Sequence, residues 1–343
     1  MKSKFFFFIF KYNYRKRAFN NFLKIKKIKN YYIFNFSGVF KYYLIGYPLY
    51  TLINKFKFFF KNFIFISCDS EPQLQFNGIN LWFGGTSHKV PEEYKKYKNN
   101  CFVIENLSKK EENLLSLYPY KPLNLKSDKE PKIIFIGNFN IKDDKFVDEI
   151  WNFEKQKILN SFTLIDTKQF WDKYNLYSNP RLQYYYIQLK ERLRLNIILE
   201  LNKIFEKKLI LVGSKWQAHI PGAIKDEYNF SKIINLYNGN ICLDFGSKWG
   251  LNNFYPRSIE IIESGGLLVQ SKQLNSLDSI DKNDVICSSN NIEELEKLLK
   301  KLLIDKKLFY ERFKKQYNFF NNEENNYLTF SKIYEIASQN NIK

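Results

Sequence analysis

A chain of 343 residues is longer than one hydrophobic core comfortably serves, so two domains are expected. Hydrophobic residues at 45% and aromatic residues at 18% are ample for globular folding. The four cysteines, Cys68, Cys101, Cys242 and Cys287, lack Cys-x-x-Cys spacing and no histidine lies near them in sequence, which argues against zinc and predicts free buried thiols in a reducing compartment.

The formal charge of +19 is concentrated at the N-terminus. No Asp or Glu precedes Asp69, whereas residues 1–68 carry fourteen Lys and Arg, which leaves about +5 for the rest of the chain. Residues 1–30 mix Phe with Lys and Arg, and Phe5–Phe10 is far shorter than the roughly 20 apolar residues that span a bilayer. We treat this stretch as a separate basic aromatic segment with three open interpretations. It binds an anionic membrane surface, it binds RNA although no RNA-binding motif is recognisable, or its composition is a drift without function.

Residues 31–125 are predicted to form a small N-terminal α/β domain. Its expected strands are Tyr31–Phe36, Phe63–Ser67 and Cys101–Glu105, with a helix around Tyr42–Phe60. Tyr118–Pro131 then has three prolines and no apolar periodicity, which is typical of a linker.

Leu81–Pro91 (LWFGGTSHKVP) is predicted to be a loop of this first domain. Its two glycines permit close backbone approach to a ligand, and His88 can accept a proton near neutral pH. His88 is therefore a candidate catalytic base, while a structural histidine on a turn stays the alternative.

Residues 131–343 are predicted to form a second α/β domain. Ile133–Ile136 is its first strand, and Gly137 makes a turn where phosphate-binding backbones lie in such folds. Leu209–Val212 is a second strand, followed by three candidate ligand-binding residues. These are a flexible Gly213, a cationic Lys215 and an indole at Trp216 that either stacks on a base or packs inside.

The remaining helices follow from apolar periodicity. The helix over residues 180–206 is expected to pack on the sheet and turn Lys190, Arg192 and Arg194 to solvent, with a phosphate contact from Arg194 as the alternative. Further helices are expected at Tyr228–Tyr237, Ile292–Leu303, Lys307–Tyr317 and Tyr327–Ala337, and a short strand at Val285–Cys287.

Asn240–Gln270 is the most informative stretch. It reads as a strand at Ile241–Phe245, a helix that begins at Pro256 and stops at Gly265 or Gly266, and a strand at Gly266–Gln270. Parallel sheets bind ligands at the carboxyl ends of their strands, so the start of this helix is expected to form one wall of a site.

This stretch resembles the C-terminal signature of CgeB-like glycosyltransferases. The resemblance rests on Asn240-Ile-Cys-Leu-Asp244, Arg257, Glu260, Gly265-Gly266 and the strand ending at Gln270. It extends upstream to Ile133–Gly137 and Ile210–Trp216, and covers roughly residues 130–340. It implies the GT-B fold: two Rossmann-like α/β domains with a cleft between them, an acceptor-side N-terminal domain, and C-terminal helices packing back on that domain.

The resemblance also implies roles for individual residues. Arg257 and Lys215 would neutralise a departing diphosphate, and Glu260 would bind the ribose hydroxyls. Gly137, Gly213, Trp216, Gly265 and Gly266 complete the expected donor-binding set. Retaining members of the wider group carry a first glutamate separated by seven residues from the second, but this chain has Asn252 there. Asp244 and Asn252 are the candidates to take the place of this glutamate in catalysis. The alternative is that both are ordinary turn residues. No divalent metal or other cofactor is expected.

The function expected from these residues is glycosyl transfer. The donor would be a nucleotide sugar, the acceptor a glycan, a lipid-linked molecule or a protein, and the location the cytoplasm, with peripheral membrane contact through residues 1–30. A non-catalytic GT-B protein of surface-polysaccharide assembly and a basic membrane- or nucleic-acid-binding protein are the alternatives.

Overall fold

The computed structural model divides into two units, Met1–Tyr120 with Glu323–Lys343, and Lys121–Asn322. The division falls within the segment where the sequence predicts a linker. The structure describes the strands of the first unit, scattered positions between residues 20 and 31, and residues 122–321 except 126–129, 139, 163–180, 226–229, 246–255 and 272–283, together with residues 331, 334 and 335.

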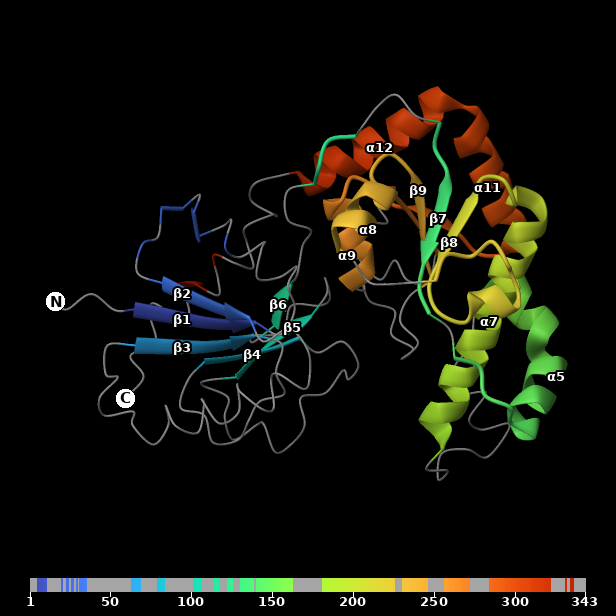
Figure 1. Ribbon diagram of the computed structural model, residues 1–343, viewed down its shortest axis with the longest axis horizontal. Coiled ribbons are helices and arrows are strands. Elements are labelled where there is room, and N and C mark those ends of the chain that lie inside the picture. The colour runs from blue at the N-terminus through green and yellow to red at the C-terminus, as the bar shows by residue number, and fades with distance from the viewer. Residues whose placement is uncertain are drawn as a thin grey trace. The chain divides into compact units, whose positions relative to one another are not determined.

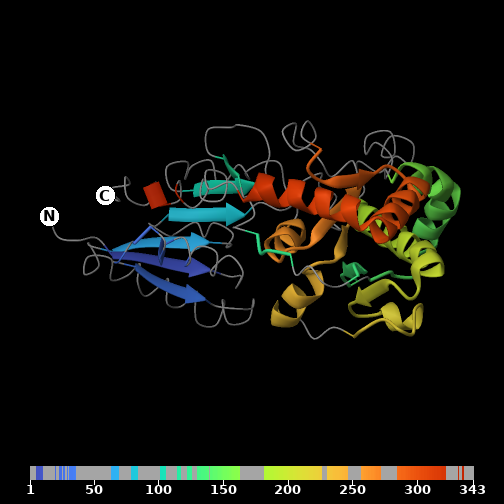
Figure 2. The same ribbon diagram turned by 90° about the horizontal axis from the view of Figure 1, so that it is seen from above.

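The first unit contains a six-stranded sheet in which every neighbouring pair is parallel. The spatial order is β2-β1-β3-β4-β5-β6, and Figure 2 shows arrows that point the same way. The strands are β1 (Phe5–Phe10), β2 (Tyr31–Asn35), β3 (Phe63–Cys68), β4 (Ile79–Phe83), β5 (Cys101–Glu105) and β6 (Leu114–Ser116).

Two predictions for this unit need correction. The separate segment 1–30 contains β1, which is hydrogen-bonded to β2 on one side and β3 on the other, with Phe8 opposite Ile33 and Ile66. A continuous run of Phe and Ile is typical of an interior parallel strand. Comparing the length of this run with that of a membrane-spanning segment, as above, does not test for a strand. Leu81–Phe83 of the predicted loop likewise belong to β4.

The second unit is α/β with a five-stranded parallel sheet in the order β11-β10-β9-β7-β8. Figure 1 labels three of its strands, β9, β7 and β8. The first strand in chain order, β7, lies between the second and the third, so the direction of winding reverses beside it. Ligand sites in open α/β sheets form at the carboxyl ends of strands beside such a reversal. The strands are β7 (Ile133–Ile136), β8 (Leu209–Val212), β9 (Ile241–Asp244), β10 (Leu267–Ser271) and β11 (Cys287–Ser289).

Six described α-helices connect or cover these strands. Asp144 caps the first through its carboxylate, which accepts from the amides of Phe146 and Val147 at 3.1 and 3.2 Å. The helices are α5 (Lys145–Ser161), α7 (Leu182–Phe205), α8 (Phe230–Tyr237), α9 (Pro256–Glu263), α11 (Ile292–Ile304) and α12 (Lys306–Phe320).

Helix α9 begins and ends where the sequence predicts. Pro256 occupies its first position, where the missing N–H costs no hydrogen bond. At the other end Gly265, at φ +77°, donates to the Ile262 carbonyl and Gly266 donates to the Ile261 carbonyl, both at 3.0 Å. This pair of bonds is a Schellman motif, which turns the chain directly into β10.

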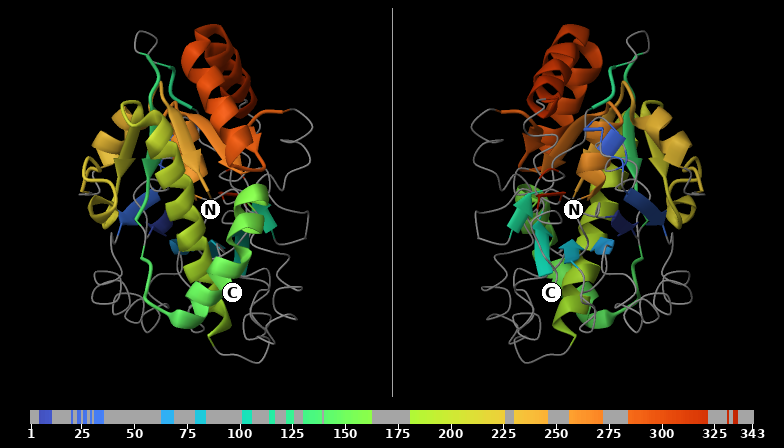
Figure 3. Two further views of the ribbon diagram at one scale, coloured as in Figure 1. Left: turned by 90° about the vertical axis from the view of Figure 1, so that its right-hand side faces the viewer. Right: turned by 90° about the vertical axis from the view of Figure 1, so that its left-hand side faces the viewer.

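Helices cover both faces of the five-stranded sheet. One core cluster joins Ile133, Phe135 and alternate residues of the other strands to buried residues of α5, α7 and α11. Figure 3 shows α5 and α7 lying side by side. Cys242 points to the opposite face, where its sulfur lies 3.6 Å from the carbonyl oxygen of Tyr237, the last residue of α8.

Candidate functional site

Arg257 lies at the point where the strand order reverses. It is on the first turn of α9, and its Nη1 donates a hydrogen bond to the carbonyl of Ile136, the last residue of β7. A Cβ on Gly137 would stand 2.7 Å from the same Nη1. Glycine therefore leaves the space that lets the guanidinium reach the carboxyl edge of the sheet.

Gly137 and Gly213 bring the ends of β7 and β8 together. The Gly137 amide donates to the Val212 carbonyl at 2.9 Å. A Cβ on Gly213 would come within 2.8 Å of the Gly137 carbonyl carbon and closer still to its oxygen, and its φ is +149°. Only glycine allows this approach of the two backbones.

Trp216 does not fill the stacking role considered for it. Its side chain is 0% exposed, packs edge to face on Phe135 with ring centroids 5.8 Å apart, and donates its indole N–H to the Gly137 carbonyl. An indole enclosed in this way cannot stack on a base. The tryptophan instead holds the turn after β7 through its hydrogen bond to the Gly137 carbonyl.

Lys215 is exposed at the carboxyl edge of the sheet. It adopts a left-handed backbone conformation with φ +73°, and its ammonium group donates to the side-chain oxygen of Asn140. The amide of Ser214 donates to the side-chain oxygen of Asn138 at 2.6 Å. Two asparagines of the loop after β7 therefore hold the loop after β8.

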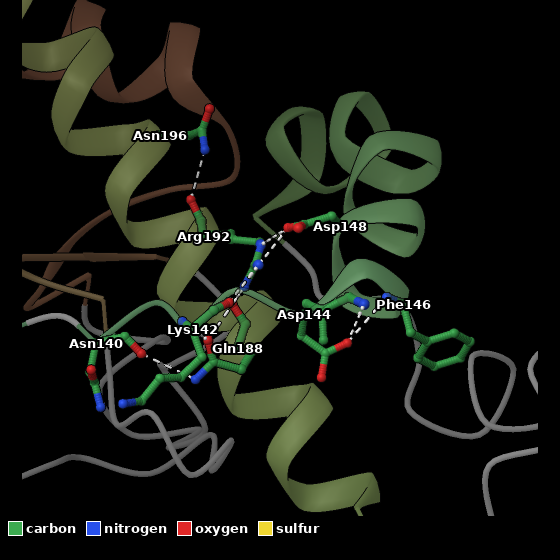
Figure 4. A network of polar contacts seen from close by, with 9 residues as sticks. Asn140, Lys142, Asp144, Phe146, Asp148, Gln188, Arg192 and Asn196 are labelled. Carbon is green, nitrogen blue, oxygen red and sulfur yellow. Dashed lines mark hydrogen bonds and ion pairs between the residues drawn. The ribbon is translucent and has the colours of Figure 1, made fainter.

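The expectation that helix 180–206 turns its charges to solvent is wrong for Arg192 and Arg194, which are 5% and 9% exposed. Both contact the loop after β7. Figure 4 shows the polar network around Arg192. Burial, with a smaller contribution from the charge of Arg194, lowers the pKa of Lys190 to about 8.

Glu260 lies one turn after Arg257, and its side chain is only 8% exposed. Tyr237 lies near both charges, and burial raises the pKa of its phenol well above the ordinary value. Its hydroxyl finds no hydrogen-bond partner within the part of the chain that the structure describes. Sequence reasoning missed Tyr237, because a tyrosine that closes an amphipathic helix looks like any core aromatic.

Asp244 is tied to helix α9. It is 2% exposed and accepts a hydrogen bond from the Ser258 hydroxyl, which itself accepts from the Gln270 amide at 2.7 Å. Asp244 and Gln270 are register partners on β9 and β10. These hydrogen bonds hold the first turn of α9 against the sheet, and so hold the backbone from which the Arg257 side chain extends.

Gly265 and Gly266 lie away from the other predicted donor-binding residues. They precede β10, whereas Gly137 and Gly213 follow β7 and β8, so in a parallel sheet the two groups lie at opposite edges. A Cβ on Gly266 would stand 2.8 Å from the sulfur of Cys242. These glycines serve the turn and the close packing of α9 rather than the carboxyl edge.

The other predicted catalytic residues, His88 and Asn252, lie outside the described residues, as does most of the expected helix Tyr327–Ala337. Among the side chains that are described, no three His, Cys, Asp or Glu gather as metal ligands. None of the described helices combines the length and apolarity needed to cross a bilayer.

The chain was compared with protein-family models, curated proteins and solved structures, and it matches none of them.

Proposed function

We propose that this chain is a glycosyltransferase that moves a sugar from a nucleotide-sugar donor to a glycan, lipid-linked or protein acceptor. The observation that carries the proposal is Arg257, whose guanidinium lies beside Gly137 where the strand order reverses. A cation, a helix N-terminus and a close-approaching glycine backbone are together suited to a diphosphate.

The proposed chemistry begins with the donor. Arg257 and Lys215 would stabilise negative charge on the departing diphosphate as the glycosidic bond breaks, with the N-terminus of α9 adding its dipole. Glu260 would accept hydrogen bonds from the two ribose hydroxyls. Asp244 is given no part in the transfer, because its side chain is 2% exposed and is hydrogen-bonded to Ser258 of α9.

The finer features of the proposal follow the resemblance to CgeB-like enzymes. The two units would be the two Rossmann-like domains of a GT-B enzyme, with the first unit on the acceptor side and His88 or Asn252 assisting transfer. Such an enzyme would need no divalent metal and would work in the cytoplasm on cell-surface glycans.

The test is a thermal-shift screen of the full chain against UDP, GDP, CDP and ADP and their sugars, with and without Mg²⁺. A ligand that binds only the folded protein raises its melting temperature. At a ligand concentration of 100 times the Kd, the free energy of unfolding rises by about 2.7 kcal/mol. We expect one nucleotide to give a shift that Glu260→Ala and Arg257→Ala remove, and sugar transfer to be lost in both variants.

Arg312→Ala is the matched control, because Arg312 is a partly exposed arginine of α12 paired with Asp284. It should keep the nucleotide shift even where its own melting temperature falls. The proposal fails if folded wild-type protein responds to none of the nucleotides, or if Arg257→Ala and Glu260→Ala turn over like the wild type. The first result favours the non-catalytic alternative.

A further inference from the structure

Helix α7 buries polar side chains that its packing on the sheet does not require. Gln188, Glu191, Arg192 and Arg194 are between 2% and 9% exposed. Burying charge is costly, and apolar residues of similar size would often be as stable or more stable. The identity of their partners explains why these side chains are polar.

Gln188 and Glu191 bind the backbone of the loop that follows β7. The Asn140 amide donates to Glu191 Oε2 at 3.2 Å, and the Asn140 carbonyl accepts from Gln188 Nε2 at 3.1 Å. The Lys142 amide donates to Gln188 Oε1 at 2.7 Å. Gln188 therefore bridges a donor and an acceptor of the same loop (Figure 4).

The two arginines bind the same loop at its ends. Arg194 Nη1 donates to the Asn138 carbonyl at 3.1 Å, and Arg192 Nη2 donates to the Lys142 carbonyl at 3.1 Å. Arg192 also pairs with Asp148 of α5 at 2.5 Å, which offsets part of the cost of burying its charge. The loop is thus held along its length by a single helix.

We infer that this polar face of α7 is a positioning device for Lys215. It holds the Asn140 backbone, and the Asn140 side chain in turn accepts the hydrogen bond from the Lys215 ammonium. Four buried residues that bind the backbone of this loop would thereby set where the exposed cation stands. That the cation meets a diphosphate rests on the proposed function, whereas the linkage from α7 to Asn140 does not.

The experiment is a double-mutant cycle between Gln188 and Lys215, with inorganic pyrophosphate as the probe and calorimetry on the full chain. Gln188 is neutral, so Gln188→Ala changes no charge near the anion. Gln188→Ala and Lys215→Ala should each weaken binding by about tenfold, and the double variant should bind no more weakly than Lys215→Ala. Gln156→Ala, in an exposed glutamine of α5, is the control that should match wild type.

If the two substitutions weaken binding additively, Gln188 does not act through Lys215 and the inference is overturned. If wild type does not bind pyrophosphate, the anion role of Lys215 fails, and amide hydrogen exchange tests the linkage without ligand. Exchange at Asn140 and Lys142 should then be at least about tenfold faster in Gln188→Ala than in wild type, with β8 amides unchanged. Equal exchange in the two proteins would overturn the linkage as well.

Discussion

At the scale of single residues, the carboxyl edge of the second sheet depends on two glycines that nearly touch. Gly213 has no room for a Cβ against the Gly137 carbonyl, and its φ lies where side chains are strained. The same carbonyl accepts the indole N–H of Trp216. A displacement of this carbonyl would therefore disturb the turn after β7 and the packing beneath it together.

Gly213→Ala should lower the stability of the second unit by about 2 kcal/mol, because the added methyl forces the two strand ends apart. For a unit of this size that corresponds to a fall in melting temperature of roughly 4–8 °C, measured by calorimetry. Gly222→Ala is the control, since nothing lies within 4 Å of a Cβ there. Equal melting temperatures for the two variants would contradict the argument.

Lys190 makes stability depend on pH in the alkaline range. Its folded-state pKa of about 8 lies below the ordinary 10.5, so the folded protein holds its proton less tightly than the unfolded chain does. The resulting destabilisation is fully present below pH 8 and disappears as the pH rises from about 8 to 10.5.

Lys190→Met should therefore melt higher than wild type at pH 7, and the difference should shrink at pH 10. Differential scanning calorimetry at the two pH values measures it. Lys207→Met, at an exposed position just after α7, is expected to shift the melting temperature by less than about 1 °C at pH 7. A Lys190→Met advantage that does not change with pH would count against a buried charge at this position.

Part of the candidate site could be read from the sequence because it depends on local position. A glycine after an apolar run, or an arginine after a helix-starting proline, lies at a strand or helix end wherever the fold places it. Gly137, Gly213 and Arg257 were predicted in this way and are together at one edge. The buried polar face of α7 could not be predicted, since Arg192 meets Lys142 from 50 residues away and such pairs leave no periodic trace.

At the scale of elements, β10 is completed by a side chain. Its partner β11 begins opposite Val269, which leaves Leu268 and Gly266 without a strand on that side. The Gln316 amide of α12 fills the gap, accepting from the Leu268 amide at 3.0 Å and donating to the Gly266 carbonyl at 2.8 Å. Gln316 is 1% exposed, so water does not replace it.

Gln316→Met keeps the shape and leaves both backbone groups buried without partners. Each orphaned group costs about 1–3 kcal/mol, so the two together should cost about 2–6 kcal/mol in a chemical denaturation experiment. Gln316→Glu should also destabilise, because a carboxylate cannot donate to the Gly266 carbonyl. Lys314→Met, at an exposed position on the same helix, should leave the free energy of unfolding unchanged within about 0.5 kcal/mol.

Strands that are buried on both faces were the easiest elements to predict. Ile133–Ile136 and Leu209–Val212 were predicted to the residue, because a short apolar run between turns has few other readings. Val285–Cys287 was placed two residues early, and α5 was not predicted. The buried residues of α5, among them Val147, Ile150 and Ile158, have helical spacing, but most of the residues between them in the sequence are polar.

At the scale of the whole molecule, the two units repeat one topology. In each sheet the first strand in the chain lies between the second and the third, and all the strands are parallel. Each unit therefore has its own reversal point, at β1 and β3 in the first and at β7 and β9 in the second. Of the donor-binding residues proposed above, all belong to the second unit.

This division predicts that nucleotide binding and sugar transfer can be separated. A fragment of residues 121–322 has its own sheet and its own core, so it should unfold cooperatively when produced alone. It should keep the nucleotide-dependent thermal shift of the full chain, and Glu260→Ala should remove that shift in both. Transfer should be absent from the fragment, because the acceptor would be bound by residues 1–120. If the folded fragment shows no thermal shift with a nucleotide that shifts the full chain, part of the donor site belongs instead to the first unit.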